Sequence, residues 1–450
     1  MKHLVRSLLL ITFMLVTTPR LRAQEPAYDP ARRYPVEELV SDLRYFQHQF
    51  DSLHPATDRY THRLVLDRTF DRLARSIREP MTSEAFLSRL SLINPKIADG
   101  HTQLLPDTAT LSYNRQTGRF FPFTVTSVGG RLYVLQNGST DTIIHAGDEL
   151  LTINGDPAAR VLKQLINRQI RDGYNETYPR WIVNKYFSAY YSYCYGQPTT
   201  FNLRFTNAKG KPDSCLVNAL SRDSIHQLHI DRYQATVTRQ GIVVAESPQP
   251  STAILAITTF DSAALQAIHQ RDVNTMIDSI FTLLQQAGKQ QLILDLRNNQ
   301  GGDFEPGRHL LRYLIDRPVS YLPGSAEHRN LQPTPNRFTG QLFVLINGGS
   351  FSNTAIVCSY LQQINRAVFI GEETGGNPVE ISGNATGIVL PHTQLQAYIS
   401  TTNYRITDQR QQGQGLSPTY PVAATIKQLI NGEDAVMQAA LKLAQQPTSR

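Results

Sequence analysis

The feature that most constrains the fold is a set of continuous apolar runs in the second half of the chain. The runs comprise residues 292–294, 342–346 and 367–370, and each ends at a polar or glycine residue. Strands without polar alternation are buried on both faces, as in parallel sheets covered by helices. Patterns of helical period separate the runs and cover residues 272–288, 306–315 and 353–364. The sequence therefore predicts an α/β fold built from right-handed β-α-β units.

The first half of the chain shows two other patterns. The region of residues 34–117 has apolar residues at helical spacing up to about residue 94, and a turn at residues 99–102 and a short apolar strand follow. Residues 118–208 favour β-strands around Gly129-Gly130 and contain a tyrosine-rich helical insertion. We therefore expect a helical region, a β-rich domain and an α/β core over residues 220–445.

Residues 1–23 have the pattern of a secretory signal peptide. Lys2 and Arg6 precede an apolar run, Leu8–Val16, and Ala23 precedes the expected cleavage point. The run is too short to cross a bilayer, so we expect a periplasmic or extracellular protein without a stable membrane anchor. Removal of the signal takes four positive charges from the formal charge of +7, and the mild remainder does not favour nucleic acid as a partner.

Cysteine and histidine spacing predicts neither a disulfide framework nor a metal site. Three cysteines are too few and odd in number for a framework. Cys194 and Cys215 either form one bridge in an oxidising compartment or remain unpaired, like Cys358. His226 and His229 lie three residues apart without a recognisable third ligand. We therefore expect no cofactor and no metal.

One strand end carries backbone groups suited to acyl-transfer chemistry. The segment Asp295–Gly302 leaves an apolar run and ends in two glycines. Gly301 and Gly302 let the backbone turn sharply and aim N–H groups into a cleft, where such groups can stabilise an oxyanion. The alternative is an ordinary turn between a strand and a helix.

A second strand end carries two candidate nucleophiles. Ser350 and Ser352 lie between another apolar run and the predicted helix 353–364. The positive end of that helix and the N–H of Asn353 favour developing negative charge, whereas the alternative role for a serine there is an N-cap. A serine nucleophile needs a base, and the candidate is His101, in a glycine-containing turn.

Taken together, these segments resemble the C-terminal-processing, or tail-specific, serine peptidases. Residues 295–302, with the pattern Asp-Leu-Arg-x-Asn-x-Gly-Gly, match that family's strand-end motif, and residues 347–352 are similar to its nucleophile loop. Residues 371–376 and 413–418 are similar to two later elements of the family. Residues 146–155 are similar to a Gly-Asp-x-Leu-x-x-Ile-Asn-Gly run of PDZ domains.

The resemblance implies both a fold and a site. The expected fold is a crotonase-like α/β peptidase core with an N-terminal helical layer and an inserted PDZ-like domain. The resemblance implies that Ser352 is the nucleophile and that Gly301 or Gly302, with the N–H of Asn353, forms the oxyanion hole. It also implies peptide or protein substrates. The sequence does not indicate the oligomeric state.

The family divides by the base that it uses. One branch has a lysine at the position of Asn377, so this chain does not fit that branch. The tricorn-like branch uses a histidine from the N-terminal part of the domain, and the segment around His101 is similar to it. That branch also has a glutamate near the late glycine element, where this chain has Gln412. The group that orients His101 is therefore open between Asp99, Glu372 and Gln412.

Three functions remain as hypotheses from the sequence. The first is an exported serine peptidase that uses Ser352 and His101. The second is a catalytically silent relative that only binds peptides or partner proteins, because the lysine and the glutamate of the two branches are both missing. The third is an esterase, but the Gly-x-Ser-x-Gly elbow expected around its nucleophile is not found at Ser352.

Overall fold

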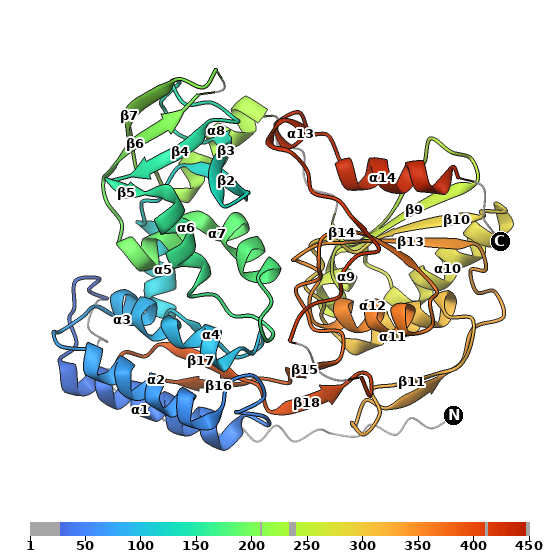
Figure 1. Cartoon of the computed structure of the whole chain (residues 1–450), viewed down its shortest axis with the longest axis horizontal. Coiled ribbons are helices and arrows are strands. Elements are labelled where there is room, and N and C mark those ends of the chain that lie inside the picture. Colours follow the sequence, from blue (N-terminus) through green and yellow to red (C-terminus); the bar gives the residue numbers. More distant parts are fainter. Residues whose placement is uncertain (1–27, 208, 234–239, 410–412, 447–450) are drawn as a thin grey trace, which may run out of the picture.

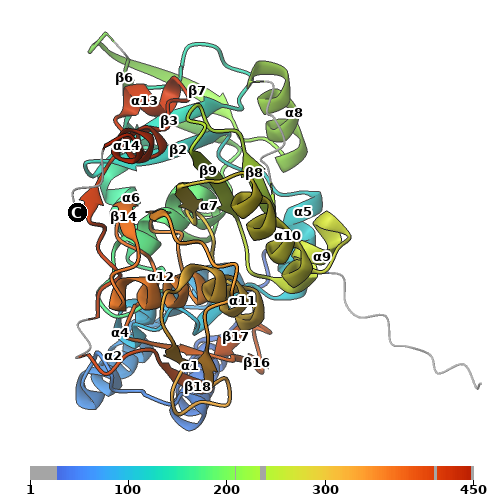
Figure 2. The same ribbon diagram turned by 90° about the vertical axis from the view of Figure 1, so that its right-hand side faces the viewer.

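The structure is a computed structural model that describes residues 28–207, 209–233, 240–409 and 413–446. The predicted signal peptide, residues 1–23, lies outside the described residues. Within those ranges, no helix combines the length and the apolar character needed to span a bilayer. The chain forms a helical layer, a β-rich unit above it and an α/β core beside both (Figure 1, Figure 2).

A six-stranded sheet lies at the centre of the core. Its order is β19-β14-β13-β10-β9-β8, and all neighbours pair in parallel except β8, which is antiparallel to β9. The strands are β8 (Ile242–Ala245), β9 (Thr252–Ile257), β10 (Gln291–Asp295), β13 (Gln341–Ile346), β14 (Val368–Gly371) and β19 (Tyr420–Pro421). The parallel sheet expected from the continuous apolar runs is therefore observed.

Alternate residues of these strands enter two separate hydrophobic cores. Leu292 and Leu294 of β10 pack into the larger core, and Ile293 between them packs into the smaller one. The larger core is covered by α9 (Ser262–His269), α10 (Val273–Gln286), α11 (Phe304–Leu314) and α12 (Asn353–Gln363). The smaller core lies under α14 (Ala435–Ala444). Burial on both faces explains why these strands lack polar alternation.

The N-terminal helices pack on strands from the other end of the chain. The helices are α1 (Val36–Leu53), α2 (Arg63–Ser76), α3 (Ser83–Leu90) and α4 (Asn94–Ile97). They share a core with a three-stranded sheet of β1 (Gln103–Leu105), β17 (Gln396–Ile399) and β16 (Thr386–Val389). Because β1 pairs with β17, the turn at residues 99–102 is attached directly to the C-terminal quarter of the chain.

The β-rich unit is an antiparallel sheet backed by two helices. Its strands are β2 (Phe123–Val128), β3 (Arg131–Asn137), β4 (Glu149–Ile153), β5 (Asp156–Pro157), β6 (Thr200–Thr206) and β7 (Pro212–Asn218). The helices are α6 (Ala158–Ile166) and α7 (Thr177–Tyr195), and α7 contains the tyrosine-rich segment. Strand β7 continues this sheet beyond residue 208, where the sequence placed the end of the domain. Cys194 and Cys215 are free thiols, so the alternative without a bridge holds.

Short elements complete the described chain. Strand β11 (Val319–Tyr321) forms a hairpin with β12 (Arg329–Leu331). Strand β15 (Glu380–Gly383) pairs antiparallel with β18 (Thr402–Arg405), and β16 and β17 lie between them in the chain. Three further helices are α5 (Thr108–Gln116), α8 (Arg222–Tyr233) and α13 (Ile426–Ile430).

A buried carboxylate ties α1 to the turn between β16 and β17. Asp42 accepts hydrogen bonds from the N–H groups of His392 (2.9 Å) and Thr393 (2.8 Å) and from the Thr393 hydroxyl (2.6 Å). We expect Asp42→Ala to lower the free energy of unfolding by about 2–4 kcal/mol, because three donors lose their acceptor. Urea denaturation measures this loss. Asp71→Ala, at an exposed ion pair with Arg44, is the control and should cost less than about 1 kcal/mol. Equal losses would contradict the prediction.

Candidate active site

Ser352 lies at the amino end of α12, after the loop that follows β13. Its backbone has a φ of 55° and a ψ of −125°, in a region that residues with a side chain rarely adopt. Its hydroxyl forms no N-cap hydrogen bond with the helix. The geometry therefore does not support the alternative in which Ser352 serves only as an N-cap.

Two glycines from other segments crowd this strained residue. A Cβ added to Gly301 would lie 2.8 Å from the Cβ of Ser352, and one added to Gly376 would lie 2.9 Å from its backbone nitrogen. No side chain fits at either position without a shift of the backbone. The close approaches hold Ser352 in a conformation that an isolated chain would avoid.

The two candidate serines differ in what their hydroxyls contact. Ser350 is fully buried, and its hydroxyl donates to the carbonyl oxygen of Leu296 (2.9 Å) and accepts from the N–H of Asn347 (3.1 Å). The Oγ of Ser352 lies 2.9 Å from Nε2 of His101. The structure thus brings Ser352, and not Ser350, to the candidate base.

Aromatic side chains hold the imidazole ring of His101. The ring stacks on Phe351 with centroids 4.8 Å apart, and Phe351 stacks on Tyr178 at 4.1 Å. Tyr178 belongs to α7, so the β-rich unit contributes to this stack. Gly100 lets the stack close, because a Cβ there would lie 2.5 Å from the Phe351 ring. The local Asp-Gly-His order therefore has a steric reason.

Asp99 is the carboxylate nearest to Nδ1 of His101. Its Oδ1 lies 4.0 Å from that nitrogen, too far for a direct hydrogen bond, and accepts the backbone N–H of His101 at 3.1 Å. Its Oδ2 accepts from the hydroxyls of Thr102 and Ser400, both at 2.6 Å, and contacts His54 at 3.0 Å. The side chain is buried, and this arrangement places a negative charge beside the imidazole.

The donors around Asp99 determine its protonation. Burial alone would raise the pKa of Asp99, but the hydrogen bond from His54, the positive charge that His101 or His54 carries when protonated, and the hydrogen bond from Ser400 together hold the pKa of Asp99 below its usual range. His54 accepts the N–H of Ala56 at Nδ1, so its Nε2 carries the proton that faces Asp99. Asp99 is therefore ionised.

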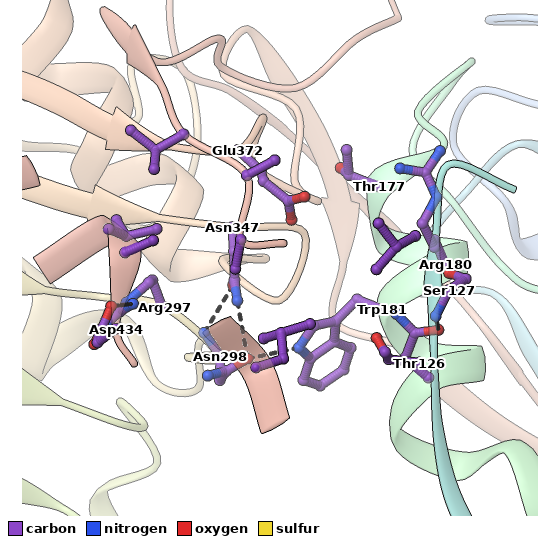
Figure 3. Close-up of a pocket in the computed structure, with 18 of the residues that line it drawn as sticks. Thr126, Ser127, Thr177, Arg180, Trp181, Arg297, Asn298, Asn347, Glu372 and Asp434 are labelled. Atoms are coloured by element: carbon purple, nitrogen blue, oxygen red, sulfur yellow. Dashed lines mark hydrogen bonds and ion pairs between the residues drawn. The ribbon is translucent and has the colours of Figure 1, made fainter. Parts of the chain in front are cut away.

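The other two candidates for orienting His101 lie elsewhere. Glu372 lines a cavity of about 620 Å³ between the β-rich unit and the core, opposite Arg180 of α7 (Figure 3). Burial by the cavity walls raises the pKa of Glu372, and the positive charge of Arg180 opposes this. Glu372 forms no hydrogen bond or ion pair with His101 in the described part of the chain. Gln412 lies outside the described residues.

The start of the nucleophile loop lines the same cavity as Glu372. Nε1 of Trp181 donates to Oδ1 of Asn298 (2.7 Å), which also accepts from the side chain of Asn347 (3.0 Å). The three side chains meet beside α7, past the ends of β10 and β13 (Figure 3). A Cβ on Gly349 would lie 2.5 Å from the Trp181 ring, so this helix packs closely on the loop before Ser352.

The predicted oxyanion donors differ in their availability. The N–H of Gly301 donates to Oδ1 of Asn299 at 2.9 Å, so it is engaged in this conformation. The N–H groups of Gly302 and Asn353 donate no hydrogen bond to any described residue. The backbone of Gly301 still lies close to that of Asn353, since a Cβ on Gly301 would be 2.8 Å from the Asn353 nitrogen.

Sequence reasoning did not find several residues of this site. His54, Ser400 and Asp172 surround the turn that carries His101, and all three are buried. Asp172 precedes a glycine, as Asp99 does, and an Asp-Gly pair predicts a turn but not its location in space. His54 and Ser400 have no local signal, because their roles depend on contacts with a segment far away in sequence.

A metal ligand set and a lysine base can both be considered at this site. Asp99, His101 and Asp172 each offer one ligand atom, and these atoms lie within 4.8 Å of one another. The carboxylate of Asp99 is already engaged by several donors, which fits a fixed negative charge better than a metal ligand.

At the position of the lysine in the other branch, Asn377 is buried and bonds to Gln414 and Val379. Its role is therefore structural.

Comparisons with known proteins show what part of the core is similar to. Residues 251–422 match the family model of Peptidase family S41, which confirms the family expected from the motifs for that segment. A C-terminal processing peptidase of the chloroplast of Tetradesmus obliquus is 27% identical over 149 residues, 31% of this chain and 32% of that protein. A carboxyl-terminal-processing protease of Synechocystis sp. is 34% identical over 102 residues, 21% of this chain and 22% of that protein. The chain thus matches about a third or less of these relatives' length.

Solved structures agree on the fold over nearly the whole chain. Mature CPAF superposes with a TM-score of 0.65 at 14% identity and covers 90% of this chain and 96% of its own. A point mutant of CPAF gives a TM-score of 0.68 at 14% identity, with 92% and 99% covered. At this identity the likeness shows a shared fold. The expectation of a serine-type peptidase agrees with the family match and with the names of the curated relatives.

The lowered pKa of Asp99 gives a prediction about stability and pH. Asp99 contributes stability above the pKa of an unfolded aspartate, about 3.9, and loses it as the pH falls below that value. Asp99→Asn lacks this contribution at every pH. We therefore expect the difference in free energy of unfolding between the two proteins to narrow from about pH 6 to about pH 3. Denaturant titrations measure it, with Asp71→Asn as an exposed control. A constant difference would contradict the prediction.

Proposed function

From the match to Peptidase family S41 we propose that this chain is an exported serine peptidase that cleaves peptide bonds through an acyl-enzyme. The observation that carries the proposal is the 2.9 Å contact between Oγ of Ser352 and Nε2 of His101. These residues come from two units of the fold, and the contact sits at the carboxyl ends of parallel strands, where ligands bind in open α/β sheets.

The proposed mechanism assigns one role to each group. His101 takes the proton of the Ser352 hydroxyl as the oxygen attacks the peptide carbonyl, and returns it to the leaving amine. The positive end of α12 and the N–H groups of Gly302 and Asn353 stabilise the oxyanion, and Gly301 joins them when Asn299 releases its N–H.

Asp99 is the group that we propose to orient His101. It fixes the backbone of the histidine through the 3.1 Å hydrogen bond and keeps a negative charge 4.0 Å from Nδ1. A distance of this size suits an electrostatic contact or one bridging water better than a direct hydrogen bond. Glu372 is better placed to contact substrate in the interdomain cavity than to contact the imidazole.

We propose that the core is crotonase-like and that the β-rich unit, residues 118–208 with the continuation in β7, is a PDZ-like domain that holds the peptide. Support comes from the edge position of β2 in its sheet and from the cavity that β2 and α7 line together (Figure 3). An exposed edge strand can accept an extended peptide as a further strand. Arg180 in this cavity complements a carboxylate of the peptide, and no cofactor takes part.

A catalytically silent peptide binder is the second candidate. The engaged N–H of Gly301 favours it, because an oxyanion hole needs free donors. The two functions differ in the reactivity of Ser352 alone, and that reactivity can be measured without a known substrate.

We expect a fluorophosphonate probe to label the folded protein at Ser352. Ser352→Ala should abolish labelling, and His101→Ala should slow it by about 10³-fold or more, because the hydroxyl loses its base. Labelling is read by intact-mass spectrometry and gel fluorescence. Ser350→Ala is the matched control and should keep its labelling, since that hydroxyl is buried against Leu296. A folded wild-type protein that resists the probe would establish the silent binder instead.

A further inference from the structure

We propose that Asp172 is a second positioning residue for His101: its carboxylate lies beside the imidazole together with that of Asp99 and stabilises the imidazolium that forms when Ser352 loses its proton. The inference deepens the proposed function and rests on it. No sequence motif pointed to Asp172, which belongs to the connection between α6 and α7 of the β-rich unit.

Asp172 binds two segments of the site through its two oxygens. Oδ1 accepts the N–H of Gly100 at 2.9 Å, the residue directly before His101. Oδ2 accepts the N–H of Asn377 at 3.2 Å, from the segment that crowds Ser352. The residue is only 3% exposed. One buried carboxylate therefore sets the position of the base relative to the nucleophile.

The connection around Asp172 is fixed on both sides. The N–H of Gly173 donates to the carbonyl oxygen of Ala98 (2.8 Å), next to Asp99. The side chain of Asn175 donates to the carbonyl oxygen of Thr374 (2.9 Å), in the segment after β14. The carboxylate thus cannot turn away from the imidazole without breaking several hydrogen bonds.

The two carboxylates and the imidazole form a compact charged group. One oxygen of Asp99, one oxygen of Asp172 and one ring nitrogen of His101 lie within 4.8 Å of one another. Two buried negative charges this close repel each other, and a positive charge between them removes the repulsion. That positive charge forms on His101 only as the reaction proceeds, so the stabilisation favours the transition state over the resting enzyme.

Protonation of the two acids agrees with this arrangement. Burial raises the pKa of Asp172, a positive charge on His101 lowers it when the ring is protonated, and the negative charge of Asp99 raises it further, so the carboxylate of Asp172 is ionised most readily when the imidazolium is present. Nδ1 of His101 is buried and has no hydrogen-bond partner among the described residues. The ring is therefore stabilised by nearby charge more than by a single hydrogen bond.

The other ionisable groups considered around this cluster are one histidine and two tyrosines. His54 contacts the far side of Asp99. Tyr60 and Tyr178 lie near Asp172, and burial, as the largest cause, raises the pKa of both phenols far above neutral pH. They remain neutral where the enzyme would act. Asp99 and Asp172 are thus the two carboxylates that lie within 4.8 Å of a ring nitrogen of His101.

The test is the rate of fluorophosphonate labelling of the full chain as a function of pH. In the wild type the rate rises as His101 loses its proton and then reaches a plateau. Asp172→Asn removes a negative charge beside the imidazolium, so His101 should lose its proton more easily. We expect the midpoint to move down by about one pH unit and the plateau to fall by about tenfold.

Matched variants separate charge from folding. Asp42→Asn removes another buried carboxylate that accepts two backbone N–H groups, far from His101, and should keep the wild-type midpoint and plateau. Asp172→Ser is the second charge-free variant, because its hydroxyl and added water can accept the N–H groups of Gly100 and Asn377 if the amide of Asn does not fit. Circular dichroism and thermal unfolding identify the folded proteins.

Each outcome decides the inference. A lower midpoint in either folded Asp172 variant, with no shift in Asp42→Asn, supports it. A wild-type midpoint in a folded Asp172 variant overturns it, even when labelling is slower, because a purely structural role changes the rate without moving the titration. Failure of both Asp172 variants to fold, while Asp42→Asn folds, also overturns it and makes Asp172 a folding residue. Absence of labelling in the wild type would refute the proposed function itself.

Discussion

The burial of one carboxylate, that of Asp99, constrains how the parts of this protein fit together. A charge removed from water needs donors, and the donors of Asp99 come from separate segments: His54 after α1, Thr102 in its own turn and Ser400 after β17. The turn can hold this charge only when the helical layer and the C-terminal strands are both in place. The site therefore forms only together with the completed tertiary structure.

The core could be predicted from the sequence because its physical signal is local. A strand such as β13 is apolar from Leu342 to Ile346, since alternate residues enter two different cores, and it ends where the chain becomes polar. The pairing of β1 with β17 could not be predicted in this way. Both strands are short, with three and four residues, and their partner choice depends on the core they share with α1.

The site, like the fold, has a part that could be predicted from the sequence and a part that could not. The segments of Ser352 and His101 carry recognisable motifs, and the structure brings the two side chains to 2.9 Å. The group behind the imidazole carried no such signal, because three residues with carboxyl or amide side chains were equally compatible with the motifs. Position in space separates two of them: Asp99 lies beside the ring, whereas Glu372 lines the cavity that α7 borders. Asp172 could not be identified from the sequence, because a buried charge is identified from the residues that surround it, and these residues belong to other segments.

The hydrogen bond from Gly301 to Asn299 has an energetic meaning for the proposed mechanism. A hydrogen bond between neutral groups contributes about 0.5–1.5 kcal/mol, whereas one donor to an oxyanion contributes about 3 kcal/mol. A change of the acceptor of the Gly301 N–H from Asn299 to the substrate oxygen is therefore unfavourable before the carbonyl is attacked and favourable afterwards. The strained backbone of Ser352 and the two glycines packed against it keep the backbone of Gly301 close to the nucleophile, where this change of acceptor can occur. The hydrogen bond between Gly301 and Asn299 therefore occupies this donor in the resting site. The donor stabilises the transition state, in which the oxyanion forms, more than the bound substrate.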